Sequence, residues 1–299
     1  MRFITGFGLC LVLNFAAVLW GCGRLADPLE LIGSSSSSHW FGSSKNFTIL
    51  TYNVAGLPDI LSNTTPSETH FEIGRRINQY DIALIQEDFS YPERLRQHAA
   101  HRYQTSPMRG YVNFQGDGLS LFSKAPVKSF VRVGWSDCLG IIGYFNDCLA
   151  EKGFTFAHIR LSEKSSIHVY NLHADAGNTR RDQRTRARQF KELANYILKH
   201  SKGRSVIVAG DTNLNLLEAS DLSTYRSFLG VTGLVDSCPV EICDPAVIDR
   251  IFWRNLGSLH LELVSGFHAP SFLDANGDPL SDHPPIAAKF RWRDQSSRK

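Results

Sequence analysis

Short runs of β-branched, aromatic and aliphatic residues recur along this chain, and they restrict its fold more than any other feature. Each run has the length of a strand and ends at polar or turn-forming residues. The runs lie at residues 47–54, 81–87, 118–123, 154–161, 166–173, 205–210, 249–253 and 284–292.

Helical patterns lie between several of these runs, most clearly at residues 186–200. Apolar side chains recur there at the spacing of one helix face: Phe190, Leu193, Ala194, Ile197 and Leu198. A sheet must bury its apolar face, and an amphipathic helix must bury its apolar stripe. We therefore predict an α/β fold in which two packed mixed sheets are flanked by helices.

The first residues resemble a targeting segment. Arg2 is followed by the apolar stretch FITGFGLCLVLNFAAVLW and then by the small residues GCG. A transmembrane helix is the alternative, but the run is short and no cationic flank follows it. We predict a signal peptide at residues 1–22 and an exported protein, either secreted or anchored in the cell envelope. Cys22 sits in a context like a lipobox, so it is a candidate lipidation site.

The rest of the chain divides by composition. Residues 23–45 include a Ser/Gly-rich stretch and are expected to form a flexible linker. The folded body is predicted at 46–293, and 294–299 form a polar tail. With 299 residues, the chain is long enough to bury a large core, and we expect a monomer. A net charge of +3 neither requires nor excludes a nucleic-acid partner.

Four cysteines remain in the predicted body, and they form two close pairs in the sequence. In an exported protein these pairs indicate two local disulfides, although four cysteines allow three connectivities. Zinc binding is the alternative, but neither a CxxC motif nor a suitable histidine spacing accompanies the thiols. The predicted pairs are Cys138 with Cys148 and Cys238 with Cys243.

Polar residues of catalytic type cluster at the ends of the predicted strands. One by one they have ordinary explanations, such as a turn for Asn53, a helix cap for Asp211 or a structural histidine for His173. Their joint occurrence favours a site, because sheets fix geometry at strand ends while loops vary. The set is Asn53, Glu87, His173, Asp211, Asn213, Asp249, Asp282 and His283.

The order of motifs that carry these residues resembles the endonuclease/exonuclease/phosphatase superfamily, also called DNase I-like, and within it the neutral sphingomyelinases. The motifs are TYNVAGLPD, IQED, GLSLFSKAPV, NLHADAG, GDTNLN, IDRIFW and SDHPPI, and they span roughly residues 48–290. GDxN followed by SDH is the most specific part. The resemblance implies a four-layer α/β sandwich and a metal-dependent phosphodiester hydrolase.

Four carboxylates cannot approach a phosphodiester without a cation to offset their charge. Mg²⁺ prefers few carboxylates together with waters and phosphate oxygens, and Mn²⁺ or Ca²⁺ are candidate substitutes. We predict metal binding by Asn53, Glu87 and Asp282; Asp282 could instead position His283. By analogy with the family, His283 is the base that activates water.

The resemblance also suggests partners for the two histidines. We predict that Asp211 orients His283 and that Asp249 pairs with His173, which faces the phosphate as a hydrogen-bond donor or acid. Asn213 is expected to donate its amide to a phosphoryl oxygen. Which histidine is the base and which the acid is left open.

The substrate is predicted to be a phosphodiester at a membrane lipid surface, as for a sphingomyelinase or phospholipase C. GLSLFSKAPV resembles secreted sphingomyelinases, and the apolar loop 138–148 could contact lipid or fold into the core. The alternative is a secreted nuclease, in which the five arginines of 180–188 bind nucleic acid, unless they form a solvated helix face. A binding module without activity is disfavoured because no site residue is missing.

Overall fold

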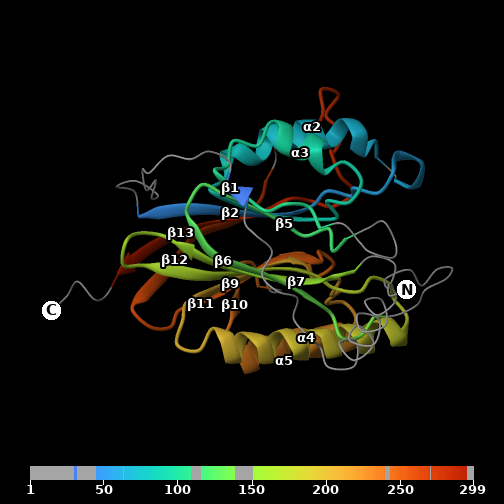
Figure 1. Ribbon diagram of the computed structural model, residues 1–299. Coiled ribbons are helices and arrows are strands. Elements are labelled where there is room, and N and C mark those ends of the chain that lie inside the picture. The colour runs from blue at the N-terminus through green and yellow to red at the C-terminus, as the bar shows by residue number, and fades with distance from the viewer. Residues whose placement is uncertain are drawn as a thin grey trace, which may run out of the picture.

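Two β-sheets stack face to face in this computed structural model, and helices cover both outer faces (Figure 1). The structure describes residues 30–31, 45–62, 64–108, 116–138, 151–239, 243–269 and 271–294. Both sheets are mixed, because each contains one parallel pair among antiparallel neighbours. The predicted fold class is confirmed.

The first sheet has, over the described residues, seven strands in the order β1-β4-β5-β3-β2-β13-β12. β2 and β3 run parallel at its centre, with Asn53 opposite Gln86. The strands are β1 (Glu30–Leu31), β2 (Asn46–Asn53), β3 (Ile82–Gln86), β4 (Tyr103–Gln104), β5 (Ser120–Ser123), β12 (Leu259–His268) and β13 (Ile286–Asp294).

The second sheet has six described strands in the order β10-β11-β9-β8-β7-β6. Its parallel pair is β8 with β9, in a register that places His173 opposite Asp211. The strands are β6 (Val127–Gly134), β7 (Gly153–Arg160), β8 (Ser166–His173), β9 (Val206–Asp211), β10 (Val235–Asp236) and β11 (Asp249–Arg254).

The helices lie outside the two sheets, as Figure 1 shows, with α2 and α3 on the first sheet and α4 and α5 on the second. Proline stands at the start of α2 and α3, where its missing N–H costs no hydrogen bond. α4 begins at Arg180, earlier than predicted, because Thr179 and Asp182 form a capping box. The helical elements are η1 (Asp59–Leu61), α2 (Pro66–Arg76), η2 (Ile77–Gln79), α3 (Pro92–Gln97), α4 (Arg180–His200) and α5 (Ala219–Thr232).

Three apolar clusters fill the three spaces between the four layers. Ile49 and Leu84 of the first sheet meet Val169 and Ile207 of the second in the central cluster. A second cluster joins the first sheet to α2 and α3, and a third joins the second sheet to α4 and α5. Because their sheets are covered on both faces, β3 and β9 are buried at every residue, which explains why they read as continuous apolar runs.

Strand direction brings the predicted site residues to one end of the sandwich. Asn53, His173 and Asp211 are the last residues of β2, β8 and β9, and Glu87 directly follows β3. Asp249 opens β11, which runs antiparallel to β9 with Asp249 opposite Asp211. Carboxyl ends of parallel strands share one edge of a sheet, so these residues must lie close together.

Several strands of the described chain were not predicted. Glu30 and Leu31, within the predicted linker, pair with Gln104 and Tyr103 as an edge strand. β6 and β12 were not predicted. Five of the eight residues of β6 are exposed or half-buried, so its sequence lacks an apolar run. Over the described residues, the helices are all too short or too polar to cross a bilayer.

One predicted disulfide is present, between Cys238 and Cys243. Cys138 is also disulfide-bonded, and Cys148, its predicted partner, lies outside the described residues. The signal peptide at 1–22 with Cys22, most of the linker and most of the tail also lie outside them. These remain predictions.

Candidate active site

Six of the eight predicted site residues form one connected cluster of side chains at the strand ends. The members are Asn53, Glu87, His173, Asp211, Asp249 and His283, which come from both sheets. Segments that are up to 230 positions apart in the sequence meet here, as in the contact of Asn53 with His283. The fold therefore brings these six predicted site residues together.

Asn53 links the two sheets at the centre of the cluster. Its Nδ2 donates to Glu87 Oε1 and to Asp211 Oδ2, each at 3.1 Å, and its Oδ1 accepts from the backbone N–H of Ala55 at 3.0 Å. Asn53 is fully buried, whereas the Glu87 side chain keeps 21% of its surface exposed. Glu87 is thus the acid of this group that faces solvent.

The backbone at the ends of these strands turns through conformations that most residues avoid. Glu87, Ala55 and Asn213 have φ values of 60°, 50° and 50°. Gly210 has a φ of 149°, and a Cβ there would come within 2.0 Å of the Leu172 carbonyl oxygen. Positive φ in residues other than glycine costs free energy and is concentrated at functional sites. Glycine at 210 lets β8 and β9 approach closely just before His173 and Asp211.

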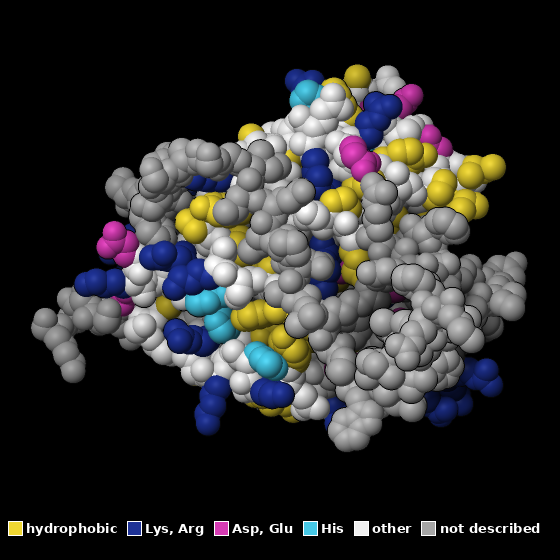
Figure 2. All heavy atoms as spheres, in the orientation of Figure 1, with side chains coloured by type: hydrophobic (Ala, Val, Ile, Leu, Met, Phe, Trp, Pro, Cys, Tyr) yellow, Lys and Arg dark blue, Asp and Glu magenta, His cyan; other side chains and the backbone are white. Residues whose placement is uncertain are grey.

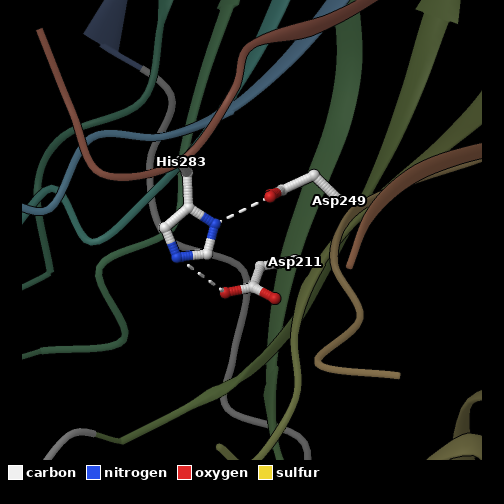
Figure 3. Close-up of side chains that lie close together, drawn as sticks. All are labelled: Asp211, Asp249 and His283. Carbon is white, nitrogen blue, oxygen red and sulfur yellow. Dashed lines mark hydrogen bonds and ion pairs between the residues drawn. The ribbon is translucent and has the colours of Figure 1, made fainter. Parts of the chain in front are cut away.

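His283 lies between two buried aspartates, as Figure 3 shows. Its Nδ1 is 2.7 Å from Asp249 Oδ2, and its Nε2 is 3.9 Å from Asp211 Oδ2. The predicted partners were wrong, because Asp249 rather than Asp211 makes the hydrogen bond that orients this ring. Asp211 and Asp249 are opposite each other on neighbouring strands, so register alone decides which one reaches His283.

His173 is the partner of Asp211 instead. Its Nε2 lies 3.4 Å from Asp211 Oδ2 and 3.8 Å from Glu87 Oε1. The side chain is only 1% exposed, and its Nδ1 has no hydrogen-bond partner among the described residues. His173 therefore contacts the acids from within the protein.

Burial and the neighbouring charges change the protonation of this cluster. Burial by itself raises the pKa of Asp211, but the hydrogen bond and charge of His173, together with the charge of His283, lower that pKa overall. Burial likewise opposes charge on His283, yet the hydrogen bond to Asp249 and the nearby carboxylates raise its pKa to about 10. His283 and Asp249 thus hold a proton between them at neutral pH.

The two other predicted residues lie at the margin of the cluster. Asn213 donates its backbone N–H to Asp211 Oδ1 at 2.9 Å and its side-chain amide to the Ala174 carbonyl at 3.0 Å. Asp282 is exposed, and among the described residues its hydrogen bond is with Ser281, at 3.5 Å. Ser281 donates to the Asn53 carbonyl at 2.7 Å. The predicted metal set is brought together only in part: Asn53 bonds to Glu87, while among the described residues no hydrogen bond or ion pair joins Asp282 to either of them.

The acids of the cluster suit a hard divalent cation. Asp211, Asp249 and His283 offer donor atoms within 4.8 Å of one another, and Glu87 adds a solvent-facing carboxylate. Within the described part of the chain, the ion pairs of Glu87, Asp211 and Asp249 are all with histidine. Oxygen donors with unneutralised negative charge are what Mg²⁺ and Ca²⁺ bind.

A pair of buried amides behind the cluster was not predicted. Gln86 Nε2 donates to Asn171 Oδ1 at 2.6 Å across the space between the sheets, and Asn171 Nδ2 donates to the Ile85 carbonyl at 2.9 Å. Gln86 directly precedes Glu87, and Asn171 lies two residues before His173. Gln86 lies in the motif IQED and Asn171 lies in NLHADAG. Their position next to site residues in the sequence could have identified them as part of the site.

Comparison with known proteins agrees with this geometry. Residues 50–283 match the Endonuclease/Exonuclease/phosphatase family. The chain belongs to this family. A sphingomyelinase of Mycobacterium tuberculosis is 34% identical over 274 residues, which cover 83% of this chain and 53% of the relative. The chain thus spans about half the length of the curated relatives it matches, and the resemblance inferred from the motifs is confirmed.

Solved structures share the fold at low sequence identity. The beta toxin of Staphylococcus aureus superimposes with a TM-score of 0.62 at 21% identity, covering 81% of this chain and 99% of the toxin. Sphingomyelinase C from Streptomyces griseocarneus gives a TM-score of 0.59 at 19% identity, covering 82% and 99%. A variant of the beta toxin has been crystallised with bound magnesium ions.

Proposed function

We propose that this protein is an exported, Mg²⁺-dependent phosphodiester hydrolase of the sphingomyelinase or phospholipase C type. The observation that carries the proposal is the convergence of three acids, two histidines and an amide at one end of the sandwich. The relatives named sphingomyelinase favour a lipid phosphodiester over other substrates of this family. The disulfide between Cys238 and Cys243 supports an oxidising compartment outside the cytoplasm.

The solvent-facing carboxylate of Glu87, with Asn53 beside it, would hold the cation. Bound Mg²⁺ supplies positive charge that offsets the phosphate and the charge developing in the transition state. Asn53 now turns its amide nitrogen toward the acids, so ligation through Oδ1 requires the amide to rotate. Asp282 is exposed close to His283 in the sequence and remains a candidate for an outer contact with the metal or the substrate.

His283 would take the proton from the attacking water through Nε2, while Asp249 holds the ring at Nδ1. This is the arrangement by which an acid fixes the tautomer of a catalytic histidine. The neighbouring acids raise the pKa of His283 to about 10, and a cation bound beside Glu87 would lower that pKa and make Nε2 available as a base. Proton acceptance by His283 would therefore depend on cation binding.

Asp211 and His173 would support the reaction from the buried side of the site. His173 holds Asp211 in place at 3.4 Å, and its N–H is a candidate proton donor to the phosphate or leaving group. Asn213, at the margin of the cluster, would present its side-chain amide to a phosphoryl oxygen of the substrate. Which histidine acts as the acid stays a proposal.

A nuclease is the alternative, and one finding weakens it. Of the five arginines in 180–188, Arg186 is fully buried in an ion pair with Asp221 at 2.8 Å, and Arg188 is paired with Asp137. Fewer of these side chains are therefore free to bind a nucleic-acid backbone than the sequence suggested.

A substrate panel tests the proposal. With Mg²⁺, the purified chain should release phosphocholine from sphingomyelin vesicles and degrade plasmid DNA slowly or not at all, and EDTA should abolish the first activity. Faster cleavage of DNA would favour the nuclease, and turnover that survives EDTA would contradict the metal requirement. The mass of the chain recovered from its host would show whether the signal segment is removed and Cys22 acylated.

A further inference from the structure

Two large apolar side chains project into solvent next to the site. Ile60 is 91% exposed and Leu61 is 68% exposed, which are the highest exposures of large hydrophobic side chains among the described residues. They belong to η1, in the loop that follows β2. We call Ile60 and Leu61 the apolar tip. The blue loop beyond the end of β2 projects at the right of Figure 1, and hydrophobic side chains protrude along the same edge in Figure 2.

The tip is a fixed structure and not a loose loop. The Leu61 N–H donates to the Pro58 carbonyl at 2.7 Å, which closes the turn. Asp59 at its base accepts hydrogen bonds from the backbone N–H and the hydroxyl of Ser67, at 2.9 and 2.6 Å. These bonds hold the turn in one conformation, in which both side chains are exposed among the described residues.

The base of the tip is bonded to the loops that carry Asn53 and Glu87. Ser62 donates its hydroxyl to the Ala55 carbonyl at 3.3 Å, and the Ala55 N–H donates to Asn53 Oδ1. The Ser90 N–H, three residues after Glu87, donates to the Gly56 carbonyl at 2.9 Å. Whatever contacts the tip is therefore held at a fixed position relative to the site.

We propose that the apolar tip inserts into the interface of a lipid bilayer and seats the site at the membrane surface. A protein partner would need a wide complementary area, whereas a lipid interface accepts a small convex group of apolar side chains. This inference rests on the proposed function, because it identifies how the same site meets a lipid substrate.

The charge beside the tip indicates which lipid surface suits it. The hydrogen bonds from Ser67 lower the pKa of Asp59, so this carboxylate stays ionised at the base of the tip. An anionic bilayer would repel it, while a zwitterionic surface such as phosphatidylcholine with sphingomyelin would not. The predicted occupant is thus a zwitterionic bilayer.

A tryptophan placed at the tip reports insertion directly. Ile60→Trp in the full chain should gain fluorescence quenching, relative to the parent, on vesicles of phosphatidylcholine and sphingomyelin with brominated acyl chains. Leu256→Trp is the matched control, because Leu256 is 46% exposed in the turn after β11, at the end opposite to Asp249. Equal quenching in the two variants would overturn the proposal.

A second measurement separates this proposal from the proposed function. The double variant Ile60→Ser, Leu61→Ser should lose about tenfold or more of its activity on vesicles, because it lacks two apolar side chains at the interface. Turnover of a soluble, monomeric phosphocholine diester should stay the same, which excludes damage to the site. Full activity of the double variant on vesicles would contradict the proposal that the apolar tip inserts into the bilayer. If the parent hydrolyses neither substrate but position 60 is still quenched, the proposed function fails and the tip stands.

Discussion

Two groups of carboxylates have different partners in this molecule. Outside the site, four of the six buried aspartates among the described residues are paired with an arginine, as in the pair of Asp221 with Arg186 at 2.8 Å and of Asp117 with Arg132 at 2.6 Å, while Asp175 and Asp182 accept hydrogen bonds from an amide side chain and a backbone N–H. At the site, Glu87, Asp211 and Asp249 lie together with histidines and an amide as their described partners. The other two arginine pairs are Asp88 with Arg96 and Asp236 with Arg250.

The difference shows where the fold keeps negative charge available. A buried carboxylate needs a partner charge or several hydrogen bonds to remain ionised. Arginine supplies both permanently, and the acid then serves the structure alone. Histidine can lose its proton, so the acids at the site retain charge for a ligand. The three acids that meet at this end of the sandwich without arginine, with Glu87 open to solvent, therefore suit the proposed cation site.

The largest effect should come from removing the histidine between Asp211 and Asp249. His283→Ala is expected to lower kcat/KM on sphingomyelin vesicles by about a thousandfold or more, because a general base is lost. The fold should survive: burial raises the pKa of Asp249 to about 7, so this acid can take up a proton once His283 is gone. Near-normal turnover would show that another group accepts the proton.

The arginine pairs should matter for stability instead. Asp221→Ala leaves Arg186 buried without its acid and should lower the free energy of unfolding by about 3–5 kcal/mol, measured by urea denaturation. Glu87→Gln is the matched change at the site and should alter that free energy by less than about 0.5 kcal/mol in EDTA, since it removes an acid with no arginine partner. Similar losses in both variants would refute the contrast between the two regions.

A smaller effect should appear in the pH dependence of stability without metal. The pKa of His283 is raised from 6.5 to about 10, so its protonated form stabilises the folded state, fully below about pH 6.5 and progressively less up to about pH 10. The free energy of unfolding should fall by roughly 2–3 kcal/mol between about pH 7 and pH 9. His283→Ala should lack this slope, and an identical slope in the variant would assign it to another group.

The sequence predicted the layers because its apolar runs are local and continuous. β9 and β3 are buried on both faces, so their residues read directly as core strands. β6 and β12 escaped prediction, since strands at or near a sheet edge expose part of their side chains and break the apolar pattern. Helix α4 was placed from its apolar face, while its first turns depend on a polar capping box.

The residue types of the site were also determined by the sequence, because acids, amides and histidines at strand ends are unusual enough to be recognised. The pairing within the site was decided only by the tertiary structure. Asp211 and Asp249 are chemically alike, and the register of β9 against β11 gives His283 to Asp249 and leaves Asp211 to His173. Ångström differences in side-chain position across two sheets decide such contacts, and no local pattern in the chain encodes them.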